Sequence, residues 1–143
     1  MDDVRFMREA LREAQRASDA GEVPVGAVIV CANRILARAH NLTETLCDVT
    51  AHAEMQAITA ASAALGGKFL SECTLYVTLE PCPMCAGALY WAQLGRLVYG
   101  AADPKRGYSL LASSLLHPLT EVTTGVLAEE SAGMLQKFFR DRR

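Results

Sequence analysis

The sequence predicts a three-layer α/β/α domain built on a mixed sheet of about five strands, and three observations support this fold class. Short apolar runs rich in β-branched residues alternate with longer segments whose apolar residues have helical spacing. Glycine and proline residues separate these segments, without repeats, low-complexity tracts or a linker. A chain of 143 residues that is 51% hydrophobic and 21% charged suits one globular domain. We therefore expect residues 1–143 to form a single domain.

The first three elements are expected to be a helix and an antiparallel strand pair. Residues 3–17 place their apolar side chains at intervals of three and four, which predicts a helix that Gly21 follows as a stop. The nearly continuous apolar run 25–31 predicts a strand covered on both faces. A tight turn at Asn33 then leads into a second strand over 35–39.

A polar, threonine-rich loop over residues 40–50 precedes the next helix. Asp48 or Thr50 is expected to cap a helix over 51–65, because both residue types favour that position. The glycine pair that begins at Gly66 is expected to end it.

The second half of the chain repeats the strand-to-helix pattern. A β-branched and aromatic run predicts a strand over 74–79, and an alanine-rich helix follows Pro81 until Gly95 ends it. The remaining expected elements are a strand over 97–100, a long irregular segment over 102–120, a strand over 122–126 and a helix over 129–140.

Charge, cysteine count and hydropathy exclude several classes of protein. A net charge of -2 does not by itself indicate a nucleic-acid binder, although a local basic patch could still bind RNA. Five cysteines are an odd number, which argues against a disulfide framework and favours metal or thiol chemistry. No apolar run approaches the ~20 residues that span a bilayer, and no basic-then-apolar leader begins the chain. We therefore expect a cytoplasmic protein.

Cys82 and Cys85 form a C-x-x-C element at a strand-to-helix junction. Their spacing puts both sulfurs on one side of a first helical turn, where the helix N-terminus favours thiolates. This element alone fits a redox pair as well as a metal site.

His52 favours the metal site. It begins the preceding helix, and helices that follow strands of the same direction begin at the same edge of the sheet, so His52 should meet the two cysteines there. One nitrogen and two sulfur ligands leave a tetrahedral zinc with an open position, which is the pattern of a catalytic site. A closed structural site would need a fourth ligand, for which the spacing offers no candidate near Cys82.

Glu54 lies two residues after His52, close enough to reach a water at the open position without acting as a ligand. We expect this carboxylate to accept the proton of the water and to protonate the leaving group. The four residues together, His52, Glu54, Cys82 and Cys85, predict a catalytic site in which one zinc per chain activates a water molecule for hydrolysis. Their resemblance to a known signature implies that the hydrolytic enzyme is a zinc-dependent deaminase.

At these residues the chain resembles the cytidine/deoxycytidylate deaminase superfamily, whose signature is H-x-E…P-C-x-x-C. Within it, the resemblance is to the bacterial tRNA-specific adenosine deaminases. The matching stretches are residues 22–28, 40–41, 50–54, 74–82, 84–88, 98–101, 103–105 and 138–139. The resemblance implies a cytidine deaminase-like fold and the hydrolysis of adenosine to inosine at the wobble position of a tRNA anticodon. It implies no organic cofactor and no membrane partner.

The resemblance also assigns substrate contacts. Asn41 would hydrogen-bond the purine edge, Val25 would line the pocket behind the base, Asp103 would touch the backbone or sugar, and Lys105 would lie near phosphate. Asn41 and Asp103 are equally typical of residues that only form turns.

Several features leave the substrate open. Ala102 stands where a basic residue is expected, and the run 82–91 also resembles guanine and cytosine deaminases, so a free nucleobase is the alternative substrate. For RNA, Arg106 and a basic C-terminal segment with Lys137, Arg140, Arg142 and Arg143 could contact phosphates, although cations also suit a helix end.

Two further features each fit two roles. Tyr90 and Trp91 would form either a homodimer surface or core. His117, in the long irregular segment, would either help to shape the pocket or be a turn residue, and the turn is the expected role.

Overall fold

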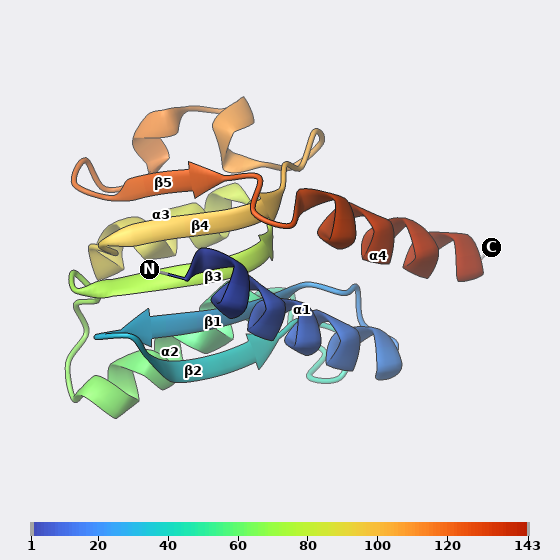
Figure 1. The fold of residues 1–143 in the computed structure, drawn as a ribbon, viewed down its shortest axis with the longest axis horizontal. Coiled ribbons are helices and arrows are strands. Elements are labelled where there is room, and N and C mark those ends of the chain that lie inside the picture. Colours follow the sequence, from blue (N-terminus) through green and yellow to red (C-terminus); the bar gives the residue numbers. More distant parts are fainter. Residues whose placement is uncertain (1, 143) are drawn as a thin grey trace.

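The computed structural model describes residues 2–142 of the chain, which form a five-stranded sheet flanked by four helices (Figure 1). The elements are α1 (Asp3–Asp19), β1 (Gly26–Cys31), β2 (Arg34–His40), α2 (Ala53–Leu65), β3 (Cys73–Leu79), α3 (Pro83–Ala92), β4 (Arg96–Ala101), β5 (Glu121–Thr124) and α4 (Ala128–Asp141). Two short 3-10 turns, Tyr108–Leu110 and Ser113–Leu115, lie in the irregular segment before β5. Among the described helices, none has the length and apolar character that crossing a membrane requires. The predicted order of elements is confirmed.

The sheet is mixed, with strand order β2-β1-β3-β4-β5. β1 pairs antiparallel with both β2 and β3, whereas β3, β4 and β5 are parallel. β2 and β3 therefore run in the same direction although β1 lies between them. The helices that follow them, α2 and α3, consequently begin at the same edge of the sheet, which is the placement that the expected metal site needs.

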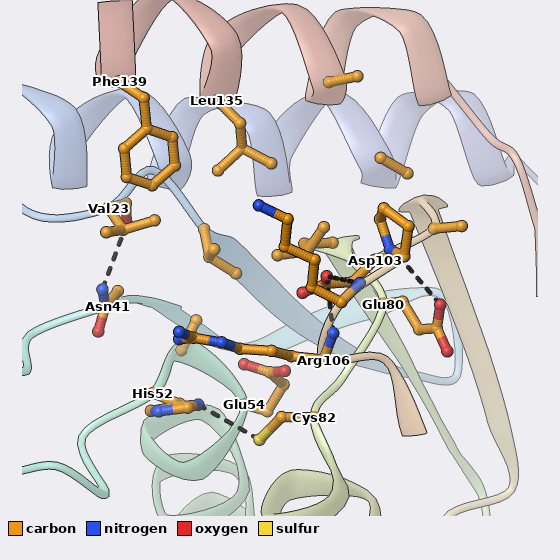
Figure 2. A pocket seen from close by; sticks show the side chains of 18 of the residues that line it. Val23, Asn41, His52, Glu54, Glu80, Cys82, Asp103, Arg106, Leu135 and Phe139 are labelled. Carbon is orange, nitrogen blue, oxygen red and sulfur yellow. Dashed lines mark hydrogen bonds between the residues drawn. The ribbon is translucent and has the colours of Figure 1, made fainter. Parts of the chain in front are cut away.

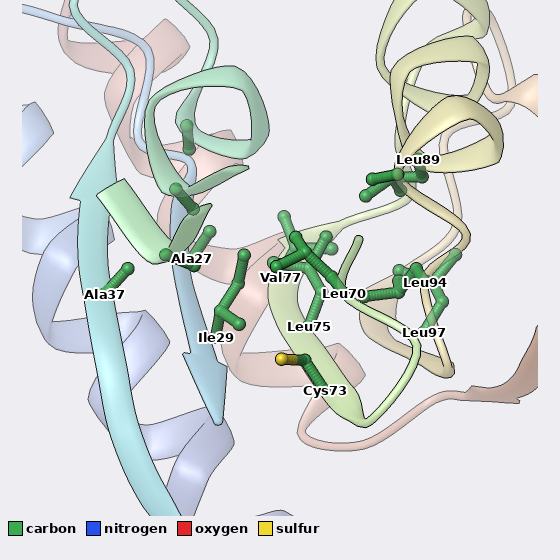
Figure 3. Packing of buried hydrophobic residues seen from close by; sticks show 14 of the residues in the cluster. Ala27, Ile29, Ala37, Leu70, Cys73, Leu75, Val77, Leu89, Leu94 and Leu97 are labelled. Carbon is green, nitrogen blue, oxygen red and sulfur yellow. The ribbon is translucent and has the colours of Figure 1, made fainter. Parts of the chain in front are cut away.

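The helices cover both faces of the sheet, as the three-layer prediction requires. In Figure 1, α1 lies in front of the sheet and α2 and α3 lie behind it. On the α1 face, Phe6 and Met7 pack with Val28, Tyr76 and Val98 in one buried cluster. Figure 3 shows the other face, where the second cluster joins strand residues to α2 and α3. Its labelled members include Ala27, Ile29, Leu75, Val77 and Leu89.

Gly26 sets the close contact between α1 and the sheet. A Cβ at this position would lie 2.0 Å from the Ala10 carbonyl oxygen and 2.4 Å from the Ala14 amide nitrogen. The backbone of α1 therefore rests directly on the start of β1, and only glycine leaves room for it.

The helix α4 packs on the same face as α1, against β3 and β4. Its two adjacent phenylalanines have different surroundings: Phe138 is 6% exposed, whereas Phe139 is 52% exposed. Phe138 therefore belongs to the core, whereas half of Phe139 remains exposed. Arg143 lies outside the described residues.

Two helix boundaries differ from the sequence-based expectations. His52, rather than Asp48 or Thr50, occupies the N-cap position of α2, with an extended backbone and no capping hydrogen bond from its side chain. Asp48 instead accepts hydrogen bonds from the backbone N–H and hydroxyl of Thr50. At the end of α3 the left-handed position belongs to Gln93, with φ 54°, and not to Gly95. A Cβ at Gly95 would lie 2.3 Å from the Ser71 carbonyl oxygen, so that glycine serves a close backbone contact.

Candidate active site

The three predicted metal ligands meet at the edge of the sheet where α2 and α3 begin. His52 is the N-cap residue of α2, Cys82 is the N-cap residue of α3, and Cys85 lies in the first turn of α3. The Nδ1 atom of His52 lies 3.6 Å from the sulfur of Cys82 and 3.6 Å from the sulfur of Cys85. All three ligand atoms lie within 4.8 Å of one another.

This spacing fits a tetrahedral zinc ion. Zinc binds thiolate sulfur at about 2.3 Å and imidazole nitrogen at about 2.0–2.1 Å, so a tetrahedral angle separates the two ligand atoms by about 3.6 Å. The observed nitrogen-to-sulfur distances equal this value. Within the described residues, no fourth histidine, cysteine or acidic side chain joins the group.

The ligand group readily provides a thiolate. The pKa of Cys82 is lowered to about 4, chiefly because its thiolate accepts a hydrogen bond from the Cys85 thiol and a further one from His52. The same interaction with Cys82 raises the pKa of His52, since the thiolate stabilises the imidazolium. The cluster therefore holds a thiolate at Cys82 that is paired with His52.

Glu54 lies in the first turn of α2, beside the ligand group. Its side chain is 4% exposed, and Figure 2 shows the carboxylate close to His52 and Cys82. Burial raises the pKa of Glu54 to about 7, because the charged form loses its hydration. A carboxyl group with this pKa can both accept and donate a proton near neutral pH.

A pocket of about 670 Å³ opens beside these four residues. All four predicted substrate residues, Val25, Asn41, Asp103 and Lys105, line it. The structure therefore brings together the ligand group, Glu54 and the predicted contacts, which come from the segment before β1, the loop after β2 and the loop after β4.

Asn41 and Asp103 both take part in turns, which is the alternative role that their residue types suggest. The Asn41 side chain accepts a hydrogen bond from Thr43 N–H at 3.2 Å and donates one to the Val23 carbonyl at 3.4 Å. Asp103 Oδ1 accepts hydrogen bonds from the backbone N–H groups of Lys105 and Arg106, each at 3.0 Å. These turns fix the residues at the pocket wall.

Sequence reasoning missed one wall of the pocket. Leu135 and Phe139 reach toward the pocket from α4, opposite the metal ligands (Figure 2). Val23 lies below Phe139, and Arg106 extends across the pocket above His52 and Glu54. The signal that could have revealed this wall is the apolar spacing of α4. More apolar side chains lie on this helix than the core covers, and Leu135 and Phe139 are among the extra ones.

The remaining sequence-predicted residues lie outside the pocket. His117 accepts a hydrogen bond from Leu119 N–H, as expected of a turn residue, and its ring lies 5.6 Å from the ring of Tyr90. Trp91 is 79% exposed, so it is not a core residue. Arg140 is exposed, and the Arg142 guanidinium lies 4.0 Å from the centre of the Phe138 ring.

Comparison with known proteins gives a consistent result. The family model for MafB19-like deaminases matches residues 1–143. A Bacillus subtilis protein named tRNA-specific adenosine deaminase is 51% identical, over 99% of this chain and 91% of the relative. A solved structure from work on A-to-I editing by tRNA:A34 deaminases at the wobble position has 45% identity and a TM-score of 0.85, covering 92% of this chain and 99% of that one. The structure of a guanine deaminase from Bacillus subtilis is 43% identical with a TM-score of 0.66, covering 68% of this chain and 63% of that one.

Proposed function

The chain belongs to the MafB19-like deaminase family, and from that premise we propose that it hydrolyses adenosine to inosine at the wobble position of a tRNA anticodon. The observation that carries the proposal is the pocket that joins the ligand group and Glu54 to a basic rim formed by Lys105 and Arg106. A base that enters it would have to leave the anticodon stack, as in other deaminases that act on nucleic acids. A tRNA-modifying enzyme works where tRNA is found, which supports the expected cytoplasmic location.

His52, Cys82 and Cys85 would hold one zinc ion per chain. When bound, zinc supplies the Lewis acidity that makes a water molecule nucleophilic at neutral pH. Glu54 would accept one proton from the attacking water and pass it to a ring nitrogen of the base. It would then carry the remaining hydroxyl proton to the amino group, which leaves as ammonia while the C–N bond breaks and the ring carbonyl forms. Its pKa of about 7 suits both directions of transfer.

We assign the four substrate contacts as follows. Val25 would lie behind the base, and Asn41 would hydrogen-bond its pairing edge. Asp103 would meet the sugar or backbone, and Lys105 would lie near a phosphate. These positions agree with the walls of the pocket, where Asn41 is 8% exposed and Lys105 is exposed at the rim.

A free nucleobase is the second candidate substrate, because the guanine deaminase from Bacillus subtilis is 43% identical over part of the chain. The decisive test incubates the purified protein with a wobble-adenosine anticodon stem-loop, free guanine and free cytosine, and measures base conversion by mass spectrometry. A stem-loop with guanosine at the wobble position is the matched control. Conversion of a free base alone would contradict the RNA proposal.

The metal and proton roles have separate tests. We expect about one zinc per chain, with zinc and activity lost together in His52→Ala. Glu54→Ala should keep its zinc and lose turnover, because that carboxylate is not a ligand. A chain without metal whose cysteines cycle with dithiol reagents would support the redox alternative instead.

We also propose a homodimer through the exposed end of α3. Tyr90 and Trp91 are 39% and 79% exposed, and their rings are in edge contact with centroids 6.0 Å apart. Aromatic side chains are enriched at such interfaces. Trp91→Glu should convert a dimer to a monomer in sedimentation experiments, and an unchanged mass would move the interface elsewhere.

A further inference from the structure

Two loops form opposite walls of the pocket, and each is attached to a buried carboxylate that takes no part in the proposed chemistry. The first is the loop after β4 together with the start of the following 3-10 turn, residues 102–109, which carries Asp103, Lys105 and Arg106. The second is the loop 41–50, which begins with Asn41 and leads to His52. The two carboxylates belong to Glu80 and Glu22, which are 3% and 0% exposed.

Glu80 holds the first loop at three points. Its Oε1 accepts a hydrogen bond from Asp103 N–H at 3.0 Å. Its Oε2 accepts from Ser109 N–H at 3.1 Å and from the Ser109 hydroxyl at 2.7 Å. The loop lies so close that a Cβ at Gly107 would be 2.3 Å from the Glu80 carboxyl carbon. Figure 2 shows this carboxylate beside Asp103, away from the metal ligands.

Glu22 holds the second loop in the same way. Its Oε1 accepts a hydrogen bond from Glu44 N–H at 3.0 Å. Its Oε2 accepts from Thr45 N–H and from the Thr45 hydroxyl, each at 2.6 Å. Each carboxylate thus receives two backbone N–H groups and one hydroxyl from the loop that it faces.

We infer that Glu80 and Glu22 are positioning residues, which fix the two pocket loops so that their side chains meet the RNA in a preformed arrangement. A buried carboxylate with three donors is satisfied only when its loop is in place, so the hydrogen bonds strongly favour one loop conformation. The inference rests on the proposed function for the identity of the substrate, but the rigidity of the loops can be measured without any substrate.

The substrate-independent test uses limited proteolysis, because each loop carries its own cleavage sites. Trypsin can cut after Lys105 and Arg106, and a glutamate-specific protease can cut after Glu44, all of which are exposed. In Glu80→Gln, an amide N–H₂ replaces one acceptor, so tryptic cleavage in the loop should become about tenfold faster or more. Glu22→Gln should accelerate cleavage after Glu44 by a similar factor.

The kinetic test separates positioning from general stability. Both variants should raise KM for the wobble-adenosine stem-loop by about tenfold or more, while kcat stays within about threefold and zinc content is unchanged. Asp3→Asn is the matched control. It breaks the ion pair with Arg96, whose strand begins at the opposite edge of the sheet, and should lower the melting temperature without moving KM.

Milder variants guard against misfolding of the glutamine variants. Ser109→Ala and Thr45→Val each remove one hydroxyl donor and leave the backbone donors in place, so each should show a smaller effect of the same kind. Ser109→Ala should add little in the Glu80→Gln background, since the two residues act through one contact.

The inference is overturned if cleavage rates and KM in both glutamine variants stay within about twofold of wild type, or if Asp3→Asn raises KM as much as they do. A wild-type protein that leaves the stem-loop unchanged would contradict the proposed function instead. Faster cleavage in the glutamine variants would then still support the positioning role of the carboxylates.

Discussion

Phe138 and Phe139 are adjacent on α4, yet truncating each to alanine should damage a different property of the protein. Phe138 is 6% exposed and packs below the Arg142 guanidinium, whereas Phe139 is 52% exposed and lines the pocket. Phe138→Ala should therefore lower stability, and Phe139→Ala should lower activity on RNA. Each variant is the control for the other, because both remove the same atoms from the same helix.

The expected loss of stability follows from burial. Removing a buried phenylalanine ring costs about 3–5 kcal/mol, and the lower value applies to the last turn of a terminal helix. An unfolding entropy of about 2.1 cal/mol/K per residue gives roughly 0.3 kcal/mol/K for 143 residues. Phe138→Ala should thus lower the melting temperature by about 10 °C, whereas Phe139→Ala should change it by no more than about 3 °C.

The expected loss of activity follows from the position of Phe139 over the pocket. Stacking of a base on an aromatic side chain is worth about 1–3 kcal/mol, so Phe139→Ala should lower kcat/KM for the stem-loop roughly 5- to 150-fold. Phe138→Ala should stay within about threefold when assayed well below its melting temperature. Thermal melts followed by circular dichroism and initial rates on the stem-loop measure the two effects. Equal loss of activity in both variants, or none in Phe139→Ala, would refute the assignment of Phe139 to the pocket wall.

Three further perturbations test other parts of the structure. Gly26→Ala should lower the free energy of unfolding by about 1–3 kcal/mol, because its Cβ would press on α1. At Gly133, exposed on α4, a Cβ meets nothing within 4 Å, so Gly133→Ala should stabilise by about 0.5–1 kcal/mol, and thermal melts with the reverse order would contradict the packing of α1. The hydrogen bonds from Arg96 lower the pKa of Asp3 below 3.8, so the stability difference between wild type and Asp3→Asn should be constant above pH 3.8 and should vanish as the pH falls through the lowered pKa. Unfolding of both proteins measured across an acid titration gives this difference, and a difference that grows in acid would contradict the lowered pKa of Asp3. Arg140→Glu should weaken stem-loop binding several-fold and reduce its salt dependence by about one counterion, whereas an unchanged salt slope in filter binding would place the RNA elsewhere.

The sequence supports the metal site better than any other feature, because its parts are local. His52 and Glu54 lie two residues apart and Cys82 and Cys85 three apart, so each pair is fixed by the geometry of one helix start. The two pairs meet because β2 and β3, the strands that precede them, run in the same direction. That prediction survives the insertion of β1 between β2 and β3, since β1 is antiparallel to both.

The remaining features depend on contacts between segments that are distant in the chain. Phe138 and Phe139 are the same residue type in one periodic pattern, and only the position of α4 against the sheet decides which one is buried. The hydrogen bonds of Glu22 and Glu80 to their loops span 22 to 29 residues, so no local spacing reveals them. The predicted N-cap of α2 was also wrong because of a contact distant in the chain. His52 occupies that position, and its side chain faces Cys82 instead of capping the helix.

The wall formed by α4 has a consequence for how new specificities can arise. The ligand group and Glu54 lie between residues 52 and 85, whereas Leu135 and Phe139 reach the pocket from the far end of the chain. Substitutions in α4 can reshape the volume above the base while the ligand distances and the Glu54 environment stay as they are. The pocket-facing side of α4 can therefore change which molecules fit the pocket, while its buried side, with Phe138, keeps the helix in place.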